Sequence, residues 1–145
     1  MFLGTYEYIM DDKGRLSVPS RFREILAEKQ LPEKLIITQG LDTCLFGYPL
    51  DEWKSFQEKI IHRPLNRGDD RYFVRRLLAG AVECPLDKQG RIMLPAGLRQ
   101  YAGLTREVVI VGVSNRFEIW SPERWQAYLK DGKSLEEIAE NIQDL

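Results

Sequence analysis

The sequence predicts an α+β fold in which two similar halves share one hydrophobic core. The first observation is a nine-residue segment that occurs twice, at residues 11–19 and 87–95, an offset of 76 positions. The second is that a helical pattern and two apolar strand patterns follow each copy in the same order. An internal repeat of this kind constrains the fold more than any single motif does.

Each copy of the repeated segment has the chemistry of a hairpin turn between two antiparallel strands. Asp accepts hydrogen bonds from the nearby backbone, and Gly tolerates the positive φ that such turns need. Apolar residues flank the turn, and the closing Pro ends the second strand because it has no N–H to donate. The turn residues are Asp11, Lys13 and Gly14 in the first copy and Asp87, Gln89 and Gly90 in the second.

Each turn leads into a helix and two further strands. Apolar residues at helical spacing after each Pro predict the helix. Gly103 ends the helix of the second copy, and turn-forming residues separate the two strands in each half. The predicted ranges are 20–28, 34–38 and 43–47 in the first half and 96–102, 107–112 and 116–120 in the second.

A longer helix follows the strands in each half. In the second half, Ser121 is a predicted N-cap with Pro122 at the first helical position. Pro49 takes that place in the first half, and Trp53 and Trp125 then occupy matching positions. The repeat therefore divides the chain into four segments: a first domain at 5–47, linking helices at 48–75, a second domain at 76–119 and C-terminal helices at 120–145.

Two amphipathic helices complete the prediction. Asp69 and Asp70 are candidate caps for a helix that links the halves, and a capping box from Ser134 to Glu137 begins the last helix. The linking helix should direct Tyr72, Phe73, Leu77 and Leu78 toward a core and present a basic face of Arg71, Arg75 and Arg76. The last helix carries an apolar stripe of Leu135, Ile138 and Ile142.

The composition is that of a water-soluble protein rather than a secreted or membrane protein. The formal net charge is −1, so any attraction to nucleic acid must come from a local patch. Cys44 and Cys84 form no CxxC motif and are expected to be buried in a reducing cytoplasm. The N-terminus lacks the pattern of a signal peptide, and no apolar run approaches the ~20 residues that span a bilayer.

The residues that carry catalysis or bind metals in other proteins are poorly represented. His62 is the single histidine and is expected at the exposed end of a helix rather than in an active site. The sequence has no phosphate-binding glycine loop. Asp11, Asp12 and Asp87 do not follow the calcium-loop pattern. We therefore expect no enzymatic activity, no metal, no cofactor and no small-molecule substrate.

Cations concentrate in the two repeated windows. Residues 11–23 carry four positive and two negative charges, and residues 87–99 carry three positive charges and one negative charge, so each window is net +2. The cations are Lys13, Arg15, Arg21 and Arg23 in the first window and Lys88, Arg91 and Arg99 in the second. The Asp and Arg of each turn could form a structural pair. We favour binding to double-stranded DNA, because the charges are duplicated and two-stranded ribbons fit the major groove.

These features resemble the MraZ family, bacterial members of the AbrB/SpoVT swapped-hairpin superfamily. The resemblance covers essentially the whole chain and rests on the N-terminal Gly4-Thr5-Tyr6 and on the two Asp-x-x-x-Arg segments, each followed by an apolar residue and a Pro. It implies two swapped-hairpin halves interleaved into one small β-barrel with helices outside. It also implies a cytoplasmic, nucleoid-associated regulator that binds promoter repeats of a division and cell-wall gene cluster as a ring-shaped homo-oligomer.

The resemblance also assigns roles to residues. The DNA-reading motif falls on Asp11 to Arg15 and on Asp87 to Arg91, with both Arg side chains reading base edges. The remaining cations should mainly hold phosphates, namely Lys13, Arg21, Arg23, Lys88 and Arg99. The turns should be shaped by Asp11, Gly14, Asp87 and Gly90. Because Gln89 stands where the first copy has Lys13, the second turn should hold phosphates more weakly.

Two other functions remain open at this point. One is an antitoxin-like DNA-binding protein of the same superfamily, in which a toxin-binding tail follows the hairpin domain. The other is an assembly module that binds no nucleic acid. A DNA-binding assay at several salt concentrations separates the second alternative from the main prediction.

Overall fold

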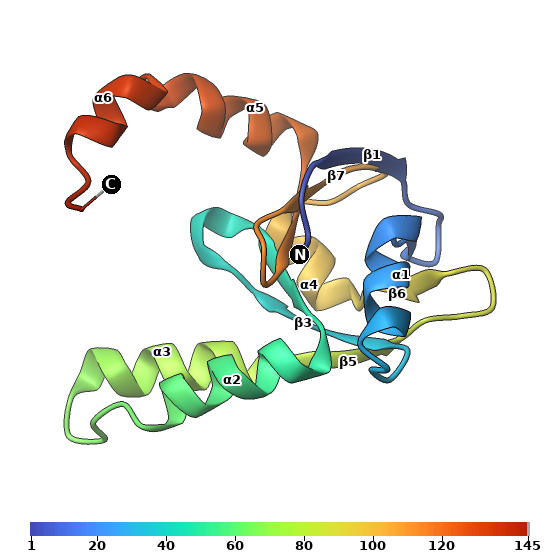
Figure 1. Cartoon of the computed structure of the whole chain (residues 1–145), viewed down its shortest axis with the longest axis horizontal. Helices are drawn as coiled ribbons and strands as arrows, with labels where there is room; N and C mark the ends of the chain where they lie inside the picture. Colours follow the sequence, from blue (N-terminus) through green and yellow to red (C-terminus); the bar gives the residue numbers. More distant parts are fainter. Residues whose placement is uncertain (145) are drawn as a thin grey trace.

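The computed structural model describes residues 1–144, which form a mixed α+β fold (Figure 1). The observed helices agree closely with the predicted ranges, since α1 and α4 have the expected bounds. In chain order the elements are β1 (Thr5–Ile9), β2 (Arg15–Ser17), α1 (Ser20–Glu28), β3 (Lys34–Gln39), the 3-10 turn η1 (Leu41–Thr43), β4 (Leu45–Tyr48), α2 (Leu50–Ile61), α3 (Gly68–Ala79), β5 (Val82–Pro85), β6 (Arg91–Met93), α4 (Ala96–Ala102), β7 (Glu107–Gly112), β8 (Phe117–Trp120), α5 (Pro122–Asp131) and α6 (Leu135–Glu140).

The strands form one large sheet and one small ribbon. The large sheet is antiparallel and has the order β1-β7-β8-β4-β3-β5, whereas β2 and β6 pair only with each other. Strands β1 and β5 are the edges of the large sheet, so it does not close on itself within residues 1–144. The closed barrel expected from the resemblance is therefore not observed.

The strands that flank each turn do not pair with each other, so a hairpin within each copy is the wrong pairing. Instead β1 pairs with β7, and β2 pairs with β6 of the other half. This exchange places Leu16 directly opposite Ile92, and both side chains are fully buried. One shared core buries a larger fraction of the surface than two separate small cores would, which favours the exchange.

Helices cover both faces of the large sheet. On one face, α1 and α4 pack over the main core, in which the rings of Phe2 and Phe22 lie 4.7 Å apart. The other face carries a second core around Tyr48, Trp53 and Trp120, against which residues of α2, α3 and α5 pack. Figure 1 shows α2–α3 and α5–α6 as two arms at the left, while both repeated turns lie at the right.

Three local predictions are corrected by the structure. Tyr72 is 63% exposed rather than directed toward a core. Arg67, not an Asp, occupies the N-cap of α3. Asp70 instead forms an ion pair with Arg63, in which Nε of Arg63 lies 2.6 Å from Oδ1 of Asp70. Strand β4 begins at Leu45 because Thr43 has a φ of +60°, which no strand residue adopts. Of the predicted stripe on the last helix, Leu135 and Ile138 lie on α6, whereas Ile142 lies beyond its end at Glu140, and all three residues are solvent-exposed.

Candidate nucleic-acid interface

The β2–β6 ribbon has one buried face and one outward face. Leu16 and Ile92 point into the main core. Side chains alternate along a strand, so their neighbours in the ribbon point the other way. The outward face therefore consists of Arg15, Ser17, Arg91 and Met93, with Arg15 opposite Met93 and Ser17 opposite Arg91. The structure thus brings the two predicted base-reading arginines onto one surface.

Each arginine is fixed by the Asp of its own turn. Oδ1 of Asp11 accepts hydrogen bonds from the backbone N–H groups of Lys13 at 3.0 Å and Arg15 at 2.9 Å. Oδ2 accepts a hydrogen bond from Nε of Arg15 at 2.6 Å. The hydrogen bonds from the Arg15 backbone and guanidinium hold the pKa of Asp11 below its ordinary value of 3.8. Asp11 therefore both shapes the turn and orients the arginine.

The second turn repeats this arrangement. Oδ1 of Asp87 accepts hydrogen bonds from the backbone N–H groups of Gln89 at 2.8 Å and Arg91 at 2.9 Å, and Oδ2 accepts one from Nε of Arg91 at 2.9 Å. The hydrogen bonds from Arg91 likewise hold the pKa of Asp87 below 3.8. Neither arginine makes a protein hydrogen bond through its terminal nitrogens within the described chain. In proteins that bind the major groove, the terminal nitrogens of arginine are the donors that contact guanine.

The two turns are braced by arginines of the opposite half. Gly14 and Gly90 have φ values of +84° and +75°, as the turn chemistry predicted. The guanidinium of Arg99 packs over Gly14 and donates from Nε to the carbonyl of Leu94 at 3.0 Å. Arg23 packs over Gly90 in the same way. Sequence reasoning grouped each arginine with its own turn, because nothing local indicates the exchange of strands.

The other predicted cations differ in their surroundings. Lys13 and Lys88 are exposed on the two turns, where a phosphate could reach them. Arg21 forms ion pairs with Glu28 at 2.8 Å and Glu24 at 3.2 Å on its own helix. These hydrogen bonds, led by the one to Glu28, raise the pKa of Arg21. The structure therefore ties Arg21 to carboxylates, whereas the two lysines stay available.

Other reactive groups are inert or isolated. Burial raises the pKa of Cys44 to about 12 and that of Cys84 to about 11, which makes both thiols poor nucleophiles. His62 is exposed, and its Nε2 lies 3.2 Å from Oε2 of Glu58, four residues earlier in the chain. Residues 1–144 contain no cluster of three metal-ligating side chains and no helix long and apolar enough to cross a membrane.

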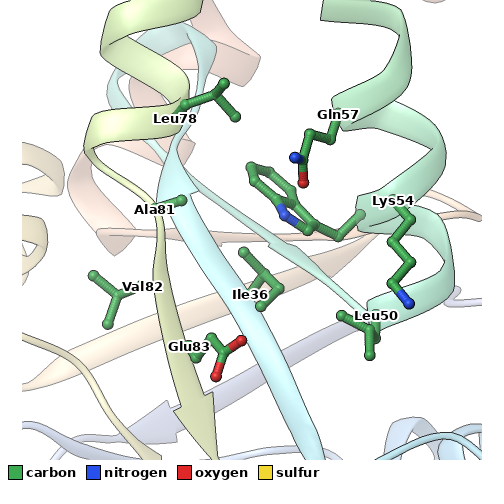
Figure 2. A pocket seen from close by; sticks show the side chains of 9 residues that line it. Ile36, Leu50, Lys54, Gln57, Leu78, Ala81, Val82 and Glu83 are labelled. Carbon is green, nitrogen blue, oxygen red and sulfur yellow. The ribbon is translucent and has the colours of Figure 1, made fainter. Parts of the chain in front are cut away.

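A cavity of about 410 Å³ lies between α2, α3 and the β3–β5 edge of the large sheet (Figure 2). Its walls include the apolar side chains of Ile36, Trp53 and Leu78. The charged residues in its lining are Lys54 and Glu83. This lining provides no nucleophile paired with a base, so the cavity lacks the arrangement of a catalytic site.

Comparison with known proteins gives a consistent result across the whole chain. A family model described as "MraZ protein, putative antitoxin-like" matches residues 1–76 and again 77–145. The chain is 50% identical over 146 residues to the transcriptional regulator MraZ of Pelotomaculum thermopropionicum, which covers 100% of this chain and 97% of that protein. It is 51% identical over 145 residues to the protein of the same name from Natranaerobius thermophilus, covering 99% of this chain and 98% of that protein.

Proposed function

Because the chain belongs to the MraZ family, whose members are named transcriptional regulators, we propose that it regulates transcription by binding specific double-stranded DNA through the β2–β6 ribbon. The observation that carries this proposal is the outward face of the ribbon. Arg15 and Arg91 share that face, and an Asp orients each of them. A two-stranded ribbon fits the width of the major groove, where Arg binds guanine through O6 and N7.

The surrounding cations have different roles in this proposal. Lys13 and Lys88 hold phosphates on either side of the groove, because both are exposed on the turns. Arg21 adds a weaker phosphate contact, since it shares its charge with two glutamates. Arg23 and Arg99 act chiefly by bracing the turns, because each guanidinium already lies against a glycine of the opposite half.

We further propose that the protein assembles into a ring-shaped homo-oligomer on repeated promoter sites of a division and cell-wall gene cluster, at the nucleoid. The family resemblance supports the target and the ring. Exposed apolar residues on the α5–α6 arm support subunit contacts, namely Tyr128, Leu129, Leu135, Ile138 and Ile142. The net charge of −1 supports multivalency, since one ribbon neutralises few phosphates and linked ribbons gain effective concentration.

The test compares binding to promoter DNA with binding to scrambled DNA of equal length at several salt concentrations. Arg15→Ala and Arg91→Ala should each reduce affinity for promoter DNA by about 5- to 150-fold per contact, the range for a lost bidentate base contact. Arg75→Ala is the matched control, because Arg75 is an exposed arginine on α3, away from the ribbon. Equal affinity of the wild-type protein for promoter and scrambled DNA would contradict the proposal and favour an assembly module.

A further inference from the structure

The outward face of the β2–β6 ribbon is nearly symmetric in charge but not in its other two side chains. Met93 and Ser17 are equivalent positions in the repeat, yet one is apolar and the other polar. Met93 lies directly opposite Arg15, and Ser17 lies directly opposite Arg91. Each arginine therefore has a chemically different neighbour across the ribbon.

Met93 does not contribute to the core. Met93 is 55% exposed, whereas the adjacent Ile92 and Leu94 are fully buried. A hollow of about 380 Å³ lies beside it, and its lining includes Arg15, Arg91 and Met93 together with the carboxylates of Asp87 and Glu83. Asp87 is bound to Arg91. An exposed apolar side chain beside two arginines and next to open space is placed to contact an apolar group of a ligand that also contacts those arginines.

We propose that Met93 is a specificity-determining residue that contacts the 5-methyl group of a thymine next to the base pair read by Arg15. This inference rests on the proposed DNA-binding function. Side chains directly opposite in an antiparallel pair are ~5 Å apart at Cβ, and successive bases are ~3.4 Å apart along the helix axis, so the two side chains reach neighbouring base pairs. The thymine methyl is the apolar group that the major groove offers. Ser17 gives Arg91 a neighbour suited to polar contacts instead.

The test uses promoter DNA in which deoxyuridine replaces every thymine, which removes the methyl groups and keeps all base pairs. The wild-type protein should bind this DNA about fourfold more weakly per contact, the effect of losing one buried methyl-sized group. Met93→Ser and Met93→Gln should bind both DNAs with equal affinity. Met93→Leu should restore the preference for thymine, and Ser17→Ala should leave it unchanged, since Ser17 neighbours the other arginine.

The possible outcomes separate this inference from the function on which it rests. If the wild-type protein prefers promoter to scrambled DNA but binds thymine and uracil DNA equally, the role of Met93 is wrong and DNA binding stands. If Met93→Ser keeps the preference for thymine, the methyl groups act through DNA shape or another residue, and the role of Met93 is again wrong. If the wild-type protein binds promoter and scrambled DNA with equal affinity, the proposed function itself fails.

Discussion

Replacing Gly14 by alanine should destabilise the protein more than the same replacement at Gly90, although the two glycines are equivalent in the repeat. Both have positive φ, at +84° and +75°, so an L-residue is strained at either site. They differ in what a Cβ would meet. At Gly14 it would lie 2.7 Å from the backbone oxygen of Leu94, whereas at Gly90 it would lie 2.7 Å from the Arg23 guanidinium.

The magnitude follows from whether the neighbour can move. The positive φ costs ~1–2 kcal/mol at both sites. Leu94 cannot shift easily, because its N–H donates to the carbonyl of Gly14 at 2.9 Å and its side chain is fully buried. Crowding at Gly14 also disturbs the hydrogen bond from Arg99 to Leu94, which adds about 1.5 kcal/mol for a charged donor. Arg23 is exposed and can swing aside, but it then loses its own hydrogen bond from Nε to the carbonyl of Val18, which is longer at 3.3 Å. We expect a loss of about 3 kcal/mol for Gly14→Ala and about 2 kcal/mol for Gly90→Ala.

The measurement is the free energy of unfolding in urea, followed by circular dichroism for each variant. Gly97→Ala is the matched control, because Gly97 lies inside α4 with open space where a Cβ would be placed. That variant should be equally stable or more stable by up to ~1 kcal/mol, since Ala favours a helix over Gly. Equal losses at Gly14 and Gly90, or a larger loss at Gly90, would refute the reasoning from steric contact.

Three further predictions concern other parts of the molecule. Because the pKa values of Asp11 and Asp87 are held below 3.8, their contribution to stability is complete above that pH and is lost as the pH falls through the lowered values. The stability difference between wild type and Asp11→Asn/Asp87→Asn, measured by urea unfolding, should therefore be constant near neutral pH and shrink as the pH falls below about 4. Cys44 and Cys84 should resist iodoacetamide at pH 8 in the native state and react in urea, as mass spectrometry would show. Leu16→Ala should cost about 2–5 kcal/mol in urea unfolding, because Leu16 is fully buried in the shared core.

The sequence predicted local structure well and long-range pairing poorly. The bounds of α1 follow from Pro19 and from apolar residues at helical spacing, which are all local signals. The turn chemistry of Asp11 and Gly14 was likewise predictable, because it depends on neighbouring backbone groups. The pairing of β2 with β6 was not readable from spacing, since a turn with flanking apolar residues also suits a simple hairpin.

The candidate site shows the same division. The sequence singled out Arg15 and Arg91 through their duplicated context, and their place on one surface follows from strand pairing. Met93 was not singled out from the sequence, because it lies inside a continuous apolar run, Ile92-Met93-Leu94, in which no polar residue marks an outward face. Its exposure becomes visible only once the register of the ribbon is known.

The exchange of strands has a consequence for how the chain reaches its native state. Thr5 pairs with Val111 and Arg15 pairs with Met93, so the first strands to be synthesised have partners that are made late. Strands β3 and β4 both lie in the first half of the chain, so their pairing can form before the second half is synthesised. We therefore expect slow, late completion of the fold, as is usual for proteins dominated by non-local contacts. The exchange also makes the two copies depend on each other, because deleting either copy would leave β2 or β6 of the other without its partner from the same chain.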